Sequence, residues 1–182
     1  MKIAFNHQIF SAQKFGGASR YFVELAKNLT MSKKNDAIIR IISPLHINNY
    51  LKNEMNNVLL QGYKFPDFKG SARICSVINS FLSPFLLKSF KPDLIHETYY
   101  NSMKQNTSRA KRIITVHDMV HEIFPEQFSK IDKVLEEKKF AIKNSDHIIC
   151  ISENTQKDLV RILDIDIEKT SVIYHGCLLS VR

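Results

Sequence analysis

The amino-acid sequence predicts an α/β domain in which a mostly parallel sheet carries helices on both faces. Short apolar segments alternate along the chain with longer segments whose apolar residues recur at helical spacing, which is typical of strands connected by helices. Residues 37–42 and 147–151 are apolar at nearly every position, as expected for strands buried on both sides of a parallel sheet. At 182 residues, the chain has the length of a single domain.

The first half of the chain begins with a predicted strand at residues 3–5, and a polar loop over residues 7–17 follows it. A helix is predicted next, because its apolar residues recur on one helical face: Tyr21, Phe22, Leu25, Ala26 and Leu29. Beyond the second strand, residues 58–60 are a candidate third strand. Residues 71–90 then form an apolar helix, in which Pro84 predicts a kink or a break.

The second half alternates more regularly. Its apolar segments predict four strands, at residues 92–96, 112–117, 147–151 and 171–174. A charged amphipathic helix is expected over residues 129–144, and another over residues 153–163, where Ser152 is a suitable N-cap. Parallel strands end at one edge of the sheet, and ligands of such sheets bind beyond that edge. The functional residues are therefore expected in the loops that follow the strands.

Composition sets limits on the class of protein. The chain is 44% apolar and 24% charged, which is ordinary for a soluble globular protein, and its net charge is +8. The basic residues form separate pairs, such as Lys33-Lys34 and Lys138-Lys139, so a solvated surface is the simplest interpretation. The charge alone also suits nucleic acid, an anionic membrane or a phosphorylated substrate. Because no nucleic-acid-reading motif accompanies it, a nucleic-acid partner is not expected.

The cysteines and the N-terminus predict a cytoplasmic protein. Cys75, Cys150 and Cys177 show no CxxC spacing, which favours free thiols in a reducing compartment. The first residues are too short an apolar run for a signal peptide, and no apolar stretch reaches the roughly 20 residues of a spanning helix. The sequons at Asn28 and Asn106 are then coincidental.

Two glycines, Gly16 and Gly17, stand just before the first long predicted helix. Glycine allows a ligand to approach the backbone closely and a helix N-terminus attracts anions, so the pair is a candidate phosphate or sugar site. The alternative is a turn that requires a positive φ angle. The dinucleotide fingerprint GxGxxG is absent, which argues against a nicotinamide or flavin enzyme.

His117 and Asp118 stand at the end of a predicted strand. The histidine can form a hydrogen bond with a substrate hydroxyl, and the aspartate can orient it or cap the turn. A metal site formed by His117 and His121 would need both on one helix, whereas this segment leaves a strand and runs into Phe124-Pro125. No metal is therefore predicted, and the structural alternative is a polar turn without chemistry.

His96 and Glu97 end another predicted strand, and Tyr99, Tyr100 and Asn101 follow closely. Aromatic rings stack on the C–H faces of sugars, while carboxylates and amides bind hydroxyl groups. This loop is therefore a candidate carbohydrate-binding segment. The alternative is a surface loop that holds a packed tyrosine pair.

In their order along the chain, these segments resemble the N-terminal half of group 1 glycosyltransferases, which form family 4 and have the GT-B fold. Residues 2–5, with residues 16–21 and 24–26, are similar to the opening of that family. PDLIH at 92–96 resembles its P-D-hydrophobic-hydrophobic-H strand. TVHD at 115–118, with FPE shortly after it, resembles the family's T-hydrophobic-H-D … F-P loop.

Two further segments complete the resemblance, which covers nearly the whole chain. SDHIICISENT at 145–155 is similar to the family's A-D strand and S-x-x-T helix start, and it contains Ser152 and Glu153. IYHG at 173–176 stands where a V-hydrophobic-x-N-G segment normally leads into the second domain. Here His175 replaces the usual asparagine.

The resemblance implies that residues 1–182 form one Rossmann-like domain, the acceptor side of a retaining, two-domain enzyme. It implies that His117 contacts the transferred sugar and that Gly16, Gly17 and Arg20 approach the donor phosphates or the reacting sugar. The remaining implied binding residues are His96, Glu97, Tyr99, Asp118, Ser152 and Glu153. The nucleotide-sugar would be a co-substrate held mainly by a C-terminal domain that this chain lacks, so the chain alone is expected to be inactive.

The same resemblance implies no metal or other cofactor. It implies a glycan or lipid-linked acceptor, in bacterial surface polysaccharide or lipopolysaccharide synthesis. An alternative is a non-catalytic module that binds a sugar phosphate or a lipid acceptor together with a partner chain. Separately, the apolar helix at 71–90 is flanked by Arg73, Lys88 and Lys91, which suits peripheral contact with an anionic membrane. Packing of that helix on the sheet is the favoured alternative.

Overall fold

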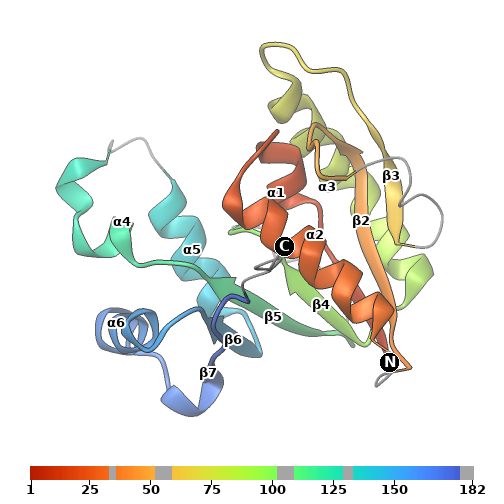
Figure 1. Ribbon diagram of the computed structural model, residues 1–182. Coiled ribbons are helices and arrows are strands. Elements are labelled where there is room, and N and C mark those ends of the chain that lie inside the picture. Colours follow the sequence, from red (N-terminus) through yellow and green to blue (C-terminus); the bar gives the residue numbers. More distant parts are fainter. Residues whose placement is uncertain (33–35, 52–58, 102–108, 129–132, 177–182) are drawn as a thin grey trace, which may run out of the picture.

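The computed structural model describes residues 1–32, 36–51, 59–101, 109–128 and 133–176. Its strands form one entirely parallel sheet in the order β3-β2-β1-β4-β5-β6-β7 (Figure 1). The strands are β1 Lys2–Phe5, β2 Ile38–His46, β3 Leu60–Lys64, β4 Leu94–Glu97, β5 Lys111–Val116, β6 His147–Cys150 and β7 Thr170–Val172. The predicted fold class is confirmed, and the strand order is that of a Rossmann-like sheet.

Helices cover both faces of the sheet, as predicted. The α-helices are α1 Gln8–Ala12, α2 Gly17–Met31, α3 Ser71–Phe90, α4 Val120–Ile123, α5 Val134–Lys143 and α6 Glu153–Leu163, and the 3-10 helices are η2 Pro125–Gln127 and η3 Ile167–Lys169. Figure 1 shows α2 and α3 on opposite sides of the sheet. Phe22 of α2 packs with Phe5, whereas Leu87 of α3 packs with Ala4 and Ile95. Neighbouring residues of one strand thus face different helices.

A further core lies under α5 and α6. Ala141 and Ile142 of α5 and Leu159 of α6 pack on alternate residues of β5 and β6, including Ile114 and Ile148. The register pairs Glu97 with Ile114, which places this core on the α3 side of the sheet. The opposite face of β5 carries Thr115, whose hydroxyl lies 2.9 Å from Nε2 of His96 on β4.

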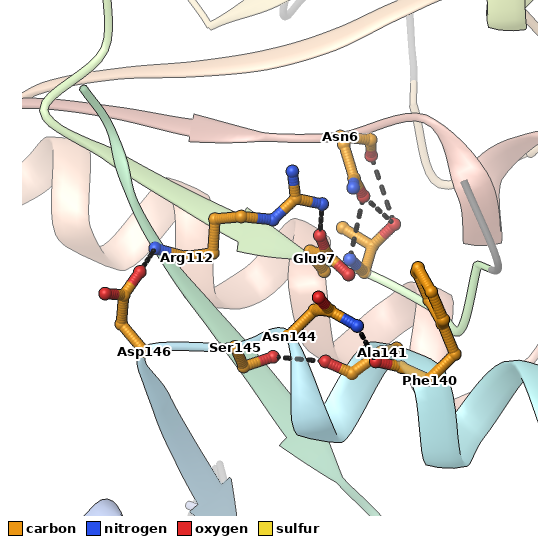
Figure 2. A network of polar contacts seen from close by, with 9 residues as sticks. Asn6, Glu97, Arg112, Phe140, Ala141, Asn144, Ser145 and Asp146 are labelled. Atoms are coloured by element: carbon orange, nitrogen blue, oxygen red, sulfur yellow. Dashed lines mark hydrogen bonds and ion pairs between the residues drawn. The ribbon is translucent and has the colours of Figure 1, made fainter. Parts of the chain in front are cut away.

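Strand order reverses between β1 and β4, which makes their carboxyl ends the topological switch point. Buried polar groups hold this junction together. The Thr98 backbone N–H donates to Asn6 Oδ1 at 2.8 Å, and the Thr98 hydroxyl donates to the same oxygen at 2.9 Å. On the neighbouring strands, Arg112 forms an ion pair with Glu97, while its backbone N–H donates to Asp146 Oδ2 at 2.8 Å (Figure 2). The Asn6–Thr98 and Arg112–Glu97 contacts fix the carboxyl ends of β1 and β4, from which the candidate site extends, whereas the exposed Asp146 contact lies at the amino ends of β5 and β6.

Several boundaries differ from the predictions. The loop predicted at residues 7–17 contains α1, because Ile9 and Phe10 are buried in the core. Pro84 was predicted to kink or break its helix; α3 continues through it, so the break is wrong, and the kink stays a prediction. Contacts on both sides of the proline hold the helix, through Asn79 to β2 and through Leu87 to the core. β2 extends to His46, and β7 ends at Val172, two residues earlier than predicted.

Other predictions about local structure are confirmed. Ser152 caps α6, since its Oγ accepts a hydrogen bond from the Thr155 backbone N–H at 3.1 Å. Cys75 and Cys150 are buried free thiols. Residue 58 of the candidate third strand, residues 129–132 of the predicted amphipathic helix, and Cys177 lie outside the described residues.

Candidate functional site

Three rings from distant parts of the chain meet beyond the carboxyl end of β5. His117 directly follows β5, Tyr21 lies on α2, and His175 follows β7. The ring centroids of Tyr21 and His117 are 5.5 Å apart, and those of His117 and His175 are also 5.5 Å apart. Tyr21 and His175 stack at 4.8 Å. The fold thus assembles a cluster of amphipathic rings around the histidine singled out from the sequence.

A buried polar chain supports this cluster from behind. His96 is enclosed by Phe5 and Phe22, and its Nε2 lies 2.9 Å from the Thr115 hydroxyl. The Thr115 side chain also forms a hydrogen bond with Tyr21, which partly offsets the rise that burial causes in the tyrosine pKa. His96 on β4 and Thr115 on β5 therefore fix the position of Tyr21 on α2.

His117 is a neutral imidazole at neutral pH. Burial lowers its pKa to about 4, and the nearby His175 and Lys138 act in the same direction, while Asp118 opposes them. Its Nε2 is buried and has no hydrogen-bond partner among the described residues. A neutral imidazole nitrogen can donate or accept one hydrogen bond, and an unpaired buried one is costly. This nitrogen is the unsatisfied polar group of the ring cluster.

A buried ion pair anchors the loop that carries His117. Lys138 of α5 and Glu122 of α4 are almost fully buried, and Lys138 Nζ lies 2.9 Å from Glu122 Oε2. The same ammonium donates to the backbone carbonyl of Asp118 and lies over the Tyr100 ring, 5.4 Å from its centroid. The Asp118 carboxylate is exposed and accepts from the Val120 backbone N–H at 3.2 Å, so it caps the turn.

The glycine pair lies at the start of α2, one turn before Tyr21. Gly16 is the N-cap in extended backbone with φ 169°, and Gly17 is the first helical residue. Neither residue lies in the left-handed φ region that favours glycine, since 169° is extended backbone, so the alternative of a turn that requires a positive φ is wrong for this pair. A Cβ added to Gly17 would meet nothing within 4 Å, whereas one added to Gly16 would meet the flexible Gln13 side chain. Arg20 is exposed on the same helix.

Replacing Gly17 with alanine is expected to separate stability from ligand binding. The substitution reduces the freedom of the unfolded chain without a clash, so the free energy of unfolding should stay equal or rise by up to ~1 kcal/mol. A ligand that approaches the α2 N-terminus would lose space, so its affinity should fall. Urea unfolding measures the free energy of unfolding of this variant, and ligand titration measures its affinity. Lower stability together with unchanged affinity would contradict the prediction.

The other residues singled out from the sequence occupy different surroundings. His96 and Glu97 are buried and have internal partners in Thr115 and Arg112. Tyr99 packs against Tyr100 with ring centroids 4.9 Å apart. Ser152 serves as a helix cap, and Glu153 is exposed with its Oε1 3.4 Å from the Tyr174 hydroxyl. Direct contact of any of these residues with substrate stays a prediction.

Within the described ranges, no group of three or more His, Cys, Asp or Glu side chains is arranged to hold a metal ion. His121 lies on the short helix α4, and His117 precedes that helix. The His121 ring instead stacks on Phe128 with centroids 3.8 Å apart.

Four residues of the site were not singled out as functional from the sequence. Tyr21 was assigned to the apolar face of its helix, Thr115 to the interior of a strand, and Lys138 to a solvated pair with Lys139. His175 stands in a loop that follows a predicted strand, where functional residues are expected, but the sequence gives it no specific role beyond its departure from a family pattern. No signal in the sequence brings these residues together, because their proximity depends on the strand order.

Comparison with known proteins identifies a family match. A family model, Glycosyltransferase Family 4, matches residues 15–180. No curated protein sequence matches the chain. Among solved structures, the lipopolysaccharide outer core galactosyltransferase WaaB in its apo form is similar over 100% of this chain and 47% of its own, with a TM-score of 0.55 and 16% sequence identity.

Two further solved structures share the fold. A glycosyltransferase from Rickettsia africae ESF-5 is similar over 96% of this chain and 43% of its own, with a TM-score of 0.54 and 18% identity. Sucrose-phosphate synthase from Thermosynechococcus elongatus is similar over 97% of this chain and 48% of its own, with a TM-score of 0.60 and 16% identity. The chain thus spans somewhat less than half of the length of each of these structures.

Proposed function

The chain belongs to glycosyltransferase family 4. We propose that it is the acceptor-binding half of a retaining glycosyltransferase. Such an enzyme transfers a sugar from a nucleotide-sugar to a glycan or a lipid-linked acceptor. The nucleotide-sugar is a co-substrate and would be held mainly by a second domain outside residues 1–182. We expect no metal or other cofactor, and no transfer by this chain alone.

The observation that carries this proposal is the environment of His117. Its imidazole is neutral, its Nε2 has no partner in the described part of the chain, and aromatic rings surround it. A sugar matches both features, because its hydroxyl groups can form a hydrogen bond with the neutral nitrogen and its C–H faces can stack on the aromatic rings. Because burial keeps the His117 imidazole uncharged at neutral pH, it offers no positive charge to a phosphate group. It is therefore suited to a hydrogen bond with a neutral sugar hydroxyl.

In this proposal the residues of the chain position the reacting groups. His117 holds a hydroxyl of the acceptor beside the transferred sugar, and Tyr21 and His175 limit the orientation of the sugar ring. The open space at Gly17, together with the N-terminus of the 15-residue helix α2, suits a phosphate or a sugar oxygen. This contribution is one of proximity and orientation. Stabilisation of the leaving nucleotide would come mainly from the second domain.

We further propose a role in bacterial surface polysaccharide or lipopolysaccharide synthesis, at the cytoplasmic face of the membrane. The likeness to a lipopolysaccharide outer core galactosyltransferase supports this role. The structures compared also include a sucrose-phosphate synthase, so the fold by itself is compatible with several acceptors.

Histidine-ring NMR of the isotope-labelled chain tests the proposal. Bacterial surface oligosaccharides should shift the ring signals of His117 and His175. The signal of His147 should not shift, because that ring lies at the start of β6 and its Nε2 pairs with Ser171 Oγ at 2.8 Å. Shifts of His117 and His175 by nucleotide-sugars alone, with no response to any acceptor, would contradict the proposed acceptor role.

A further inference from the structure

Helix α3 has its polar and apolar faces inverted relative to an ordinary surface helix. Its buried residues recur four positions apart and are mostly small or polar: Ser71, Cys75, Asn79, Ser83 and Leu87. Its large exposed residues are apolar instead, and they include Val77, Phe81 and Phe85 at 53%, 69% and 71% exposure. A helix that only covered a sheet would bury these side chains. α3 packs on the sheet, as the favoured alternative predicted, but it does so mainly through small and polar residues.

Hydrogen bonds on the buried side hold α3 in this orientation. Asn79 Oδ1 accepts from the Leu45 backbone N–H at 2.8 Å, and Asn79 Nδ2 donates to the Leu45 carbonyl and the Ser11 hydroxyl. The Ser83 hydroxyl pairs with His7 Nδ1 at 2.9 Å. Rotating the helix to bury its phenylalanines would break all of these contacts in the interior, where unpaired polar groups are costly. The outward apolar face is therefore a fixed feature of the fold.

The charges around this face have one sign. α3 contains no acidic residue, and the exposed cations on and beside it are Lys69, Arg73, Lys88 and Lys91. The acidic residues that flank the helix have other partners. Asp67 forms an ion pair with Lys14, and Asp93 Oδ2 accepts from the Lys2 backbone N–H at 2.7 Å. An apolar stripe bordered by unopposed cations complements the interface of an anionic bilayer.

We propose that the outer face of α3 is a membrane-docking surface. Val77, Phe81 and Phe85 would enter the headgroup–acyl boundary, and Arg73 and Lys88 would contact anionic headgroups. No helix in the described ranges is long and apolar enough to cross a bilayer, and α3 would lie in the plane of the interface. The inference depends on the inverted helix and not on the proposed acceptor role.

Docking through α3 also orients the candidate site. The partners of Asn79 and Ser83 include Ser11 and His7, which follow β1 at the edge of the sheet where the site lies. The ring cluster lies on the other side of the sheet, because Tyr21 belongs to α2 (Figure 1). Docking through the outer face of α3 would therefore leave the ring cluster facing away from the bilayer.

Vesicle co-sedimentation of the 182-residue chain tests the proposal. We expect binding to vesicles of mixed phosphatidylglycerol and phosphatidylcholine at low salt, and weaker binding to phosphatidylcholine alone. The double variant F81S/F85S should lower the partition coefficient about tenfold or more. The control M31S/I167S, which also removes two exposed apolar side chains, should bind like the wild type.

Two charge variants distinguish binding through α3 from attraction of the whole basic protein to anionic lipid. R73Q/K88Q should weaken binding to anionic vesicles at low salt, whereas K139Q/K157Q removes the same charge from other exposed positions and should weaken it less. Circular dichroism checks that all variants fold. Absence of wild-type binding at low salt, or equal loss in both charge variants, would overturn the proposal. So would self-association that F81S/F85S abolishes without any vesicle binding, because the face would then be a protein interface.

Discussion

Lowering the pH from 7 to about 4 is expected to unfold the domain, because three buried histidines must then bind protons that the native fold excludes. His7, His46 and His96 are 4%, 1% and 3% exposed. Burial lowers their pKa values from 6.5 to about 4, about 4 and about 3, with a smaller contribution from Lys64 at His46 and from His117 at His96.

The direction of this effect follows from proton binding. Below pH 6.5 the unfolded chain takes up protons on these rings that the folded chain does not, so the free energy of unfolding falls as the pH falls. The loss begins near pH 6.5 and is complete only below the folded pKa values. At pH 4 it amounts to roughly 3 kcal/mol for each ring, or roughly 9 kcal/mol together. Typical domains have only about 5–15 kcal/mol of stability.

Urea unfolding at pH 7, 6 and 5 measures this dependence. The chain has no tryptophan, so far-UV circular dichroism is the suitable signal. Between pH 7 and pH 5 His117 adds to this dependence, because burial lowers its pKa to about 4 as well. The variant His46→Gln removes one of these four rings and should lower the slope of stability against pH by about one quarter. A free energy of unfolding that stays constant or increases between pH 7 and pH 5 would contradict the prediction.

Replacing Lys138 with methionine is expected to destabilise the fold by about 3–5 kcal/mol, the second large effect. Glu122 would then keep a buried carboxylate without its countercharge, since both side chains of the pair are nearly inaccessible. The Asp118 carbonyl would also lose its donor, so the loop that carries His117 should lose its anchor. The neighbouring Lys139→Met is the control, because Lys139 is exposed and its loss should cost less than about 0.5 kcal/mol.

A double-mutant cycle identifies the cause. The variant K138M/E122L removes both charges and should recover a large part of the stability lost in K138M, because no isolated charge stays buried. Chemical denaturation of the four proteins in the cycle gives the coupling energy. If the double variant loses as much stability as the two single variants combined, the pair is not coupled and the interpretation of Lys138 as an anchor fails.

The sequence predicted the order of strands and helices because apolar periodicity records which faces are buried. It failed where tertiary contacts override local preference. α1 is too short to show a helical period, and Ile9 and Phe10 form it by packing into the core. Pro84 disfavours a helix locally, yet Asn79 and Leu87 hold α3 on both sides of it.

The candidate site was predicted only in part, for a related reason. His117 and the glycine pair could be singled out because strand ends and helix starts are visible in the sequence. His175 is also visible as a strand-end residue, but its contact with Tyr21 is not, and neither are the roles of Tyr21 and Thr115, because these depend on how α2, β5 and β7 meet in space. Lys138 looked like a solvated surface charge, and only the structure shows it buried against Glu122.

Saturation-transfer NMR on the purified chain tests the central claim most directly. The ligands are a panel of nucleotide-sugars and a panel of bacterial glycan and lipid-linked acceptors, measured with the wild type and with His117→Ala. We expect signals from acceptors but not from nucleotide-sugars, and loss of the acceptor signals in the variant. Tight binding of a nucleotide-sugar by this chain alone would contradict this expectation, because the donor site would then lie within residues 1–182.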